Sequence, residues 1–333
     1  MTVPVLAWVL TVGAILGMLA VDYVGHVRTP HTPSLKEAAR WSAVYVGVAL
    51  VFGVVVWAVW GGDFGEQYFA GYVTEKSLSV DNLFVFVLIM STFRVPRQYQ
   101  QKVLLVGITV ALVLRTVFIL LGAAAIASFS WVFYLFGLFL VWTAIAQVRH
   151  ARDHDEEFTE NGVLRLVRRV LPTTDEFVGD RLTKKVDGKR LITPMLVVMI
   201  AIGSADLLFA VDSIPAIFGL TEETYLVFAA NAFSLLGLRQ LFFLVDGLLD
   251  RLVYLGYGLA AILGFIGAKL LVHALHTNEL PFLNGGRHVT VIPEIPTELS
   301  LGVIVAVLTV TTLASLHHDR RARAHVRPTP EGH

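Results

Sequence analysis

The chain of 333 residues contains no cysteine, which excludes disulfides, thiolate nucleophiles and thiolate metal sites. A metal site in this chain would have to use oxygen or imidazole ligands, and oxygen ligands suit hard cations such as Mg²⁺, Ca²⁺ or Mn²⁺. Charged residues are also scarce, at 16% of the chain, compared with about 25% in soluble domains. The formal net charge is zero, so no overall positive field indicates nucleic acid as a partner.

Long apolar runs take the place of the missing charge, and 56% of the residues are hydrophobic. Nine stretches approach or exceed the roughly 20 residues that a helix needs to cross a bilayer. The sequence therefore predicts an all-α polytopic membrane protein with about nine transmembrane helices, embedded in a lipid bilayer. The predicted spans are Val3–Val24, Trp41–Trp60, Tyr68–Thr92, Val103–Ala125, Trp131–Val148, Pro194–Phe218, Leu226–Val245, Leu252–Val272 and Leu299–Leu316.

Polar segments divide the chain into four parts. Residues 1–148 are predicted to form a first transmembrane half and residues 194–316 a second one. A cytosolic loop at 149–193, expected to form short helices, joins the halves, and a cytosolic tail follows at 317–333.

Basic residues indicate the orientation. The first one, Arg28, follows the first apolar run, whereas a signal peptide begins with its basic stretch. If the N-terminus is outside, the cytosolic connectors hold nearly all the lysines and arginines, and only Arg287 lies on the outer side. We therefore expect a multi-pass protein of the cell membrane with its N-terminus outside and its C-terminus in the cytosol.

Two acidic motifs repeat inside the spans. The third span contains EKSLSVDNLFVF at Glu75–Phe86, and the sixth contains DLLFAVDSIPAI at Asp206–Ile217. In both, an acid lies six residues before the aspartate of a Val-Asp pair, which is Asp81 in the first motif and Asp212 in the second. Because three spans separate them, the two motifs would insert in opposite directions. This predicts an inverted three-helix repeat of spans 3–5 and 6–8, an architecture common in transporters, with the site between the repeats.

The repeated charges predict a cation site. An ionisable residue at the centre of a span costs about 2.5–3.5 kcal/mol on insertion scales, and such residues usually mark an ion or substrate path. Residues seven apart share a helix face, so each motif presents a wedge of oxygen atoms. Partnership in a buried salt bridge is the alternative role, and for Glu75 and Asp206 the two are evenly balanced. The predicted cation ligands are Asp81, Asp212, Glu75, Asp206, Asn82 and Ser213.

Two arginines in the fourth and seventh spans, Arg115 and Arg239, occur in similar Leu-Arg contexts and are predicted to be structural counter-ions. The four carboxylates and two arginines sum to two negative charges, which one divalent cation would neutralise. Pro215 is expected to kink the sixth span beside Asp212, because proline clashes with the carbonyl four residues earlier. Asn231 is expected to hydrogen-bond between helices.

No nucleophile–base pair, phosphate loop or cofactor motif is visible in the sequence, so we expect no enzymatic activity and no tightly bound cofactor. Asp22 and His26, at the end of the first span, are expected to form an interfacial polar cluster.

The strings EKSLSVDNLFVF, FAVDSIPAIFGLT, GLRQLFF and TDEFVGD resemble the TerC family of integral membrane proteins, and the resemblance extends from Asp22 to His273. This family belongs to a lysine-exporter-like group built from inverted three-helix repeats. The resemblance implies that Glu75, Asp81 and Asn82, with Asp206, Asp212 and Ser213, are the functional positions. Relatives often carry Glu-Phe-Thr-Asp where this chain has Gly-Ser-Ala-Asp at 203–206, so one carboxylate and one hydroxyl are missing here.

The resemblance leaves two classes of function open. The first is export of a hard divalent cation, with Mn²⁺ favoured because relatives are implicated in Mn²⁺ efflux. The second is a membrane factor that helps other membrane or exported proteins to insert or to acquire metal. Tellurium resistance, for which the family is named, would be indirect, because a chain without cysteine cannot reduce tellurite through a thiol.

Overall fold

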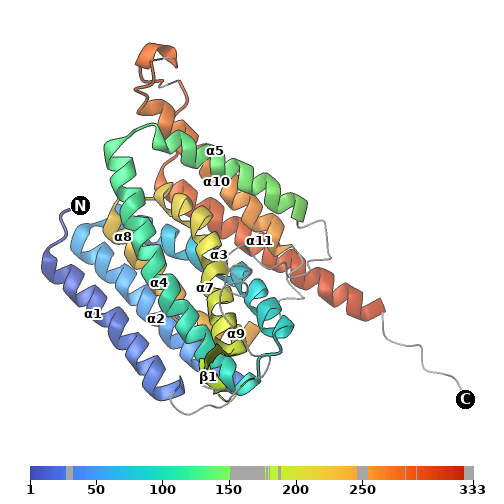
Figure 1. The fold of residues 1–333 in the computed structure, drawn as a ribbon. Coiled ribbons are helices and arrows are strands. Elements are labelled where there is room, and N and C mark those ends of the chain that lie inside the picture. Colours follow the sequence, from blue (N-terminus) through green and yellow to red (C-terminus); the bar gives the residue numbers. More distant parts are fainter. Residues whose placement is uncertain are drawn as a thin grey trace, which may run out of the picture.

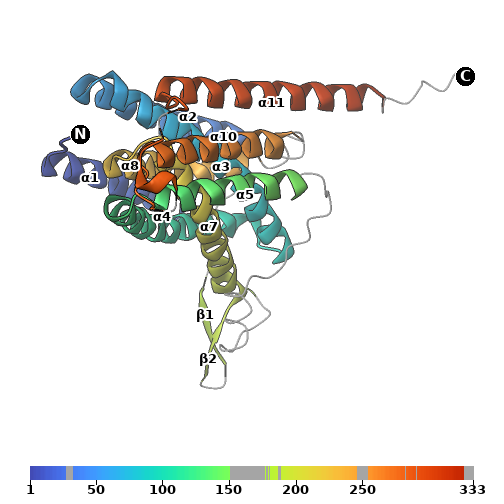
Figure 2. The same cartoon turned by 90° about the horizontal axis from the view of Figure 1, so that it is seen from above.

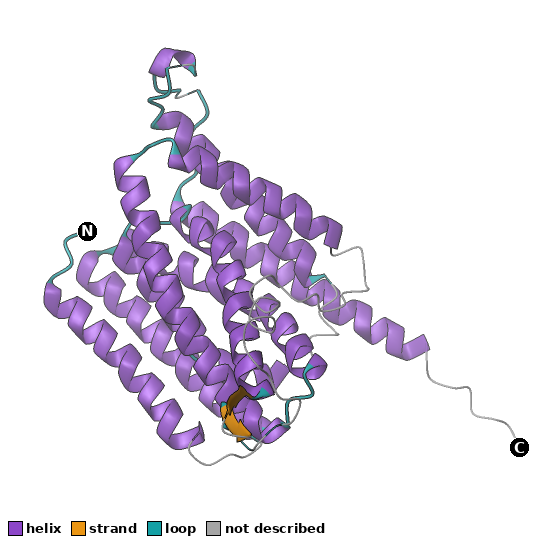
Figure 3. Cartoon of the chain, viewed as in Figure 1, coloured by secondary structure: helices purple, strands orange, loops and turns teal. Residues whose placement is uncertain are grey.

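A computed structural model describes residues 1–27, 33–150, 177, 179, 181–186, 189–245, 254–281, 283–289 and 291–325. The described part is helical except for one short hairpin and the connecting loops (Figure 3). Its elements are α1 (Val5–Asp22), η1 (Tyr23–Val27), α2 (Leu35–Trp60), α3 (Gly62–Thr92), α4 (Arg97–Ser128), α5 (Val132–His150), β1 (Thr183–Val186), β2 (Lys189–Ile192), α7 (Pro194–Phe218), α8 (Thr224–Leu235), α9 (Leu238–Val245), α10 (Leu255–His276), η3 (Asn284–Gly286) and α11 (Thr297–His325).

Eight segments of the described chain are helical, long and apolar enough to cross a membrane. The protein is therefore an all-α polytopic membrane protein, as predicted. Helix α3 corresponds to the remaining predicted span, the third; it is 31 residues long but carries Glu75, Lys76 and Asp81 near its middle. It lies inside the bundle against α2, α7 and α8, where protein rather than lipid surrounds its charges. Apolar side chains such as Val9 and Val54 on α1 and α2 are exposed, as lipid-facing residues would be.

The helices of the two halves interlock. Helix α4 of the first half packs against α7 of the second, α8 of the second packs against α3 of the first, and α5 packs against α10. A two-fold axis relating spans 3–5 to spans 6–8 would produce this exchange of neighbours. The inverted repeat itself stays a prediction.

The seventh span is broken in the middle of the protein. Helix α8 ends at Leu235, Leu236 is extended, and α9 begins at Leu238. Gly237 between them has φ +81°, a left-handed conformation that favours glycine. The seventh span is buried along nearly its whole length, and irregular backbone at membrane depth is tolerated only where protein or a cavity surrounds it. In the sixth span, by contrast, α7 continues through Pro215 to Phe218 without a break, and the kink expected at Pro215 stays a prediction.

The connectors differ from the prediction in two places. Strands β1 and β2 form an antiparallel hairpin in which Thr183 pairs with Ile192 and Val186 with Lys189. The expectation of helices in the 149–193 loop is therefore wrong for this part, while residues 151–176 lie outside the described chain. Helix α11 continues to His325, beyond the predicted end of its span at Leu316, and the rest of the tail is not described.

The connectors fall at opposite ends of the bundle. In Figure 1 the N-terminus and the orange segment between α10 and α11 lie at the upper left, whereas the β1–β2 hairpin and the end of α11 lie lower down. Seen from above, α11 runs along one side of the bundle and the hairpin projects from the other (Figure 2). This arrangement agrees with the predicted alternation of outer and cytosolic connectors, but which end faces the cytosol stays a prediction.

We expect Gly237→Ala to lower the melting temperature of the purified protein. A left-handed backbone costs a non-glycine residue about 1–2 kcal/mol, and the added Cβ would lie 2.8 Å from Tyr45 Cβ. Gly13→Ala is the matched control, because Gly13 has no atom within 4 Å of that position. Equal melting temperatures for the two variants would show that the break does not depend on Gly237.

Candidate functional site

Four helices bring polar side chains together in the interior of the bundle. Helices α3 and α4 each contact both α7 and α8 there, and α4 can approach α7 closely because Gly107 has no Cβ to collide with Ile202. Five side chains from these helices meet, and none is more than 2% exposed. We call them the central network: Glu75 from α3, Arg115 from α4, Asp206 and Ser213 from α7, and Asn231 from α8.

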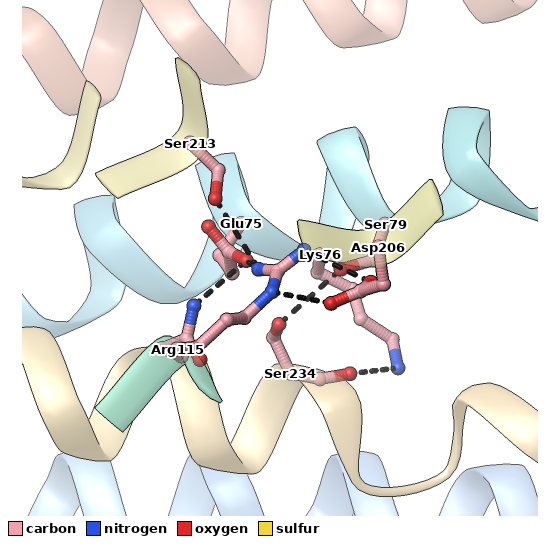
Figure 4. A network of polar contacts seen from close by, with 8 residues as sticks. Glu75, Lys76, Ser79, Arg115, Asp206, Ser213 and Ser234 are labelled. Atoms are coloured by element: carbon pink, nitrogen blue, oxygen red, sulfur yellow. Dashed lines mark hydrogen bonds and ion pairs between the residues drawn. The ribbon is translucent and has the colours of Figure 1, made fainter. Parts of the chain in front are cut away.

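Arg115 lies at the centre of this network (Figure 4). Its Nε and Nη2 donate to the two carboxylate oxygens of Asp206 at 2.8 and 3.1 Å, a bidentate contact. Its Nη1 donates to Glu75 Oε1 and, at 3.2 Å, to the hydroxyl of Ser213. One guanidinium therefore joins the first acid of each repeated motif across the interface of the two halves, which fits the planar, multidentate geometry of arginine.

Two acceptor atoms in the network lack a donor. Asn231 Nδ2 donates to Glu75 Oε1 at 2.9 Å, but the second carboxylate oxygen of Glu75 and the amide oxygen of Asn231 are buried without a hydrogen-bond partner in the described structure. Buried polar atoms are nearly always satisfied, so an exception points to a missing water, ion or alternative state. Two neighbouring side chains that each present an unused oxygen suit a cation.

Lys76 links this network to the break in the seventh span. Its ammonium donates to the carbonyl oxygen of Ser234 at 3.0 Å, one residue before the end of α8. A helix that stops here leaves its last carbonyls without intrahelical donors, and a cation at a helix C-terminus is favourable. The hydroxyls of Ser79 and Ser234 lie 3.5 Å apart beside this contact (Figure 4).

The second acid of each motif is less enclosed. Asp81 and Asp212 are partly buried; Asp81 accepts a hydrogen bond of 3.0 Å from Gln147 of α5. Asp212 lies close enough to Arg115, Glu75 and Asp81 to interact with them electrostatically. The structure thus gathers all four predicted carboxylates around one interface. The last predicted ligand, Asn82, is buried on α3.

Arg239 lies apart from the central network. It donates to Asp22 Oδ1 at 2.8 Å and to Gln101 Oε1 at 2.7 Å, near the end of the bundle where α1 ends and α4 begins. Its pairing with the acidic motifs, assumed in the predicted charge balance, is therefore wrong. The similar sequences around Arg115 and Arg239 do not reflect equivalent positions in the structure. The residue of the seventh span that reaches the carboxylate of the opposite half is Asn231.

Lys76 restores the charge balance that Arg239 cannot provide. The four carboxylates, with Arg115 and Lys76 as the nearby cations, still leave two formal negative charges. In the described residues, however, no group of three or more histidine, aspartate or glutamate side chains is arranged to hold a metal ion. Arg115 lies between Glu75 and Asp206 and separates them, so cation binding at the six predicted ligands stays a prediction.

Sequence reasoning missed three parts of this site. Lys76 was visible as a charge in a span, but its depth could not be fixed from one sequence. Gln147 gave only the weak signal of an amide near a span end. In the sequence, Gly237 looks like any other glycine in an apolar run, because its positive φ is seen only in the fold.

Comparison with protein families shows which family the chain belongs to. The model of the integral membrane protein TerC family matches residues 60–323. This chain belongs to the TerC family. The matched range includes both acidic motifs and every residue of the central network.

Relatives of this TerC family member cover almost all of it. An uncharacterized membrane protein of Mycobacterium tuberculosis is 55% identical over 318 residues, which are 95% of this chain and 80% of the relative. An uncharacterized membrane protein of Myxococcus xanthus is 39% identical over 95% of this chain and 93% of its own length. The putative membrane-bound redox modulator Alx of Escherichia coli K12 is 35% identical, over 91% of this chain and 93% of its own. No solved structure matches the chain.

We expect Arg115→Gln to destabilise the protein severely. Removing one partner of a buried ion pair costs about 3–5 kcal/mol, because the remaining charge stays buried without compensation. Adding Glu75→Gln and Asp206→Asn to Arg115→Gln should recover part of the lost melting temperature. Arg287→Gln, at an exposed arginine, is the control. An Arg115→Gln protein that melts with the wild type would contradict a structural role for this ion-pair network.

Proposed function

We propose that the protein exports a hard divalent cation, Mn²⁺ in the first instance, through the interface between its two halves. The observation that carries the proposal is the gathering of four carboxylates against two cationic side chains, with one oxygen of Glu75 left without a donor. Carboxylate, amide and hydroxyl oxygens are the ligands that such ions prefer. Ionisable groups inside membrane spans also mark ion paths by default.

Arg115 acts as a substitute cation in this scheme. With its guanidinium between Glu75 and Asp206, the two first acids share one positive charge while no metal is bound. An arriving ion would meet the less buried Asp81 and Asp212 first. It would then displace the guanidinium from one carboxylate, so that Asn231 and the unpartnered oxygen of Glu75 complete its ligand set.

A cavity at one end of the bundle provides an exit for the ion in this scheme. It has a volume of about 460 Å³ and is lined by Gln67 of α3, Gly219 beyond the end of α7, and the nearby loops. Glu75 is eight residues from Gln67, so the cavity begins about 12 Å, or roughly two helical turns, beyond the central network. Glu222 on its wall accepts a hydrogen bond from His273, which holds the pKa of this carboxyl below its usual value. An ionised carboxylate in an open mouth favours cations.

We place the protein in the cell membrane with its N-terminus outside. The predicted topology places the cavity and Arg287 outside the cell membrane, and the β1–β2 hairpin and the C-terminus in the cytosol. Export then runs from the hairpin end of the bundle toward the cavity. The name of the Alx relatives suggests redox modulation, but a chain without cysteine has no thiol for that step, and a change in cellular metal would act on redox balance indirectly.

We expect Asp81→Asn and Asp212→Asn to abolish Mn²⁺ flux through purified protein in liposomes, because each removes an ionised ligand. Cells that express these variants should accumulate Mn²⁺ relative to cells with the wild type. Asp63→Asn, at an exposed acid in the first turn of α3, is the matched control and should transport normally.

Two results would overturn the proposal. Wild-type protein that carries no Mn²⁺ in liposomes would favour the alternative, a membrane factor for insertion or metallation of exported proteins. Flux that persists in correctly folded Asp81→Asn and Asp212→Asn would show that the path lies elsewhere in the molecule.

A further inference from the structure

A second buried charge cluster lies away from the central network. Asp22 Oδ1, at the end of α1, accepts hydrogen bonds from the hydroxyl of Tyr45 at 2.6 Å, Arg239 Nη2 at 2.8 Å and Gln240 Nε2 at 3.0 Å. Arg239 Nη1 donates in turn to Gln101 of α4. All five side chains are at most 4% exposed. The cluster therefore ties α9 to α1, α2 and α4.

This cluster grips the broken span directly after its break. Arg239 and Gln240 follow Gly237 by two and three residues, and Tyr45 packs on Gly237 while it donates to Asp22. On the other side of the break, Ser234 is held by Lys76, the neighbour of Glu75. The seventh span thus consists of two short helices: α8 belongs to the central network, and α9 belongs to the Asp22 cluster.

Empty space borders α9 on two sides. A small cavity of about 10 Å³, room for no more than one water molecule, is lined by Gln101, Arg239, Gln240 and Phe243 together with residues of α2. A larger one of about 500 Å³ is lined by Phe242 with the end of α3 and the start of α4. Since protein interiors are normally close-packed, the larger space beside Phe242 gives α9 room to change position on that side.

The bonding of the cluster is also incomplete. Arg239 Nε and Gln240 Oε1 are buried and have no hydrogen-bond partner in the described structure. A half-satisfied polar network contributes little to stability compared with an apolar core, and a buried ion pair is weak evidence for a stabilising role. A contact that forms and separates during function explains these features better than a fixed strut.

We propose that the Asp22–Arg239 ion pair is a latch that holds α9 closed over the end of the path opposite the 460 Å³ cavity, and that α9 swings about Leu236–Gly237 when the latch opens. Asp22 and Arg239 are then positioning residues, which act on the central network through the break and contact no transported ion. The role in transport rests on the proposed function, whereas the movement itself does not.

The absence of cysteine in the chain permits a direct test. Ser79→Cys places one thiol beside the central network, and a membrane-impermeant maleimide is applied to right-side-out and inside-out vesicles. We expect Asp22→Asn and Arg239→Gln to raise the labelling rate only from the side on which α1 ends. The increase should be about fivefold or more, the lower end of typical coupling between sites. The matched control is Arg40→Gln, at an exposed arginine near the same end, which should leave the labelling rate unchanged.

Arg239→Lys keeps the charge and should label more slowly than Arg239→Gln. Unchanged labelling in folded Asp22→Asn and Arg239→Gln would overturn the latch, and so would an equal increase from both sides, which indicates general loosening. If these variants do not fold, Ala38→Cys and Phe243→Cys, at two positions that line the small cavity, are joined by a bifunctional maleimide. Compared with the unjoined protein, the joined protein should show slower labelling of the thiol at position 79 from the side on which α1 ends. An unchanged labelling rate would contradict the latch.

The two proposals fail separately. If the wild type carries no Mn²⁺ but the Asp22 and Arg239 variants label faster from one side only, the latch is supported and Mn²⁺ export is refuted. If the wild type carries Mn²⁺ but the Asp22 and Arg239 variants do not change labelling, Mn²⁺ export is supported and the latch is refuted.

Discussion

The contact of one guanidinium with two carboxylates inside the membrane determines how this protein is arranged. Arg115 can bond Glu75 and Asp206 together only if α3, α4 and α7 cross at one depth. Each of these charges would be unfavourable in lipid on its own. The three are tolerated because the guanidinium offsets the carboxylate charges in the centre of the bundle, with α3 shielded by helices whose outer faces are apolar.

The broken seventh span separates two polar clusters with different roles. Helix α8 contributes Asn231 and the Ser234 carbonyl to the central network. Helix α9 contributes Arg239 to a cluster around Asp22. A rigid continuous helix would move both clusters together, whereas a break at Gly237 allows the position of α9 to change while α8 keeps its contacts. Cation binding and closure of one end can then be coupled without being identical.

The sequence was sufficient for the spans, because hydrophobic length is a local property that a bilayer requires directly. It was also sufficient for the gathering of Glu75, Asp81, Asp206 and Asp212, because charges in a span must find one another. It failed for Arg239, because similar sequences in two helices do not determine how deep in the membrane their arginines lie. It did not find the helix break in the seventh span, because the left-handed φ of Gly237 cannot be recognised before its neighbours are placed.

The central claim is that the interface of α3 and α7 binds a divalent cation in exchange for contacts of Arg115. The most direct measurement is an experimental structure of the protein with Mn²⁺, in which the ion is located by its anomalous scattering. Our account predicts a peak between the two acidic motifs, bonded to oxygens of Asp81 and Asp212, with Arg115 withdrawn from Glu75 or Asp206. A Mn²⁺-saturated protein with no peak at this interface, and with Arg115 still between both carboxylates, would contradict it.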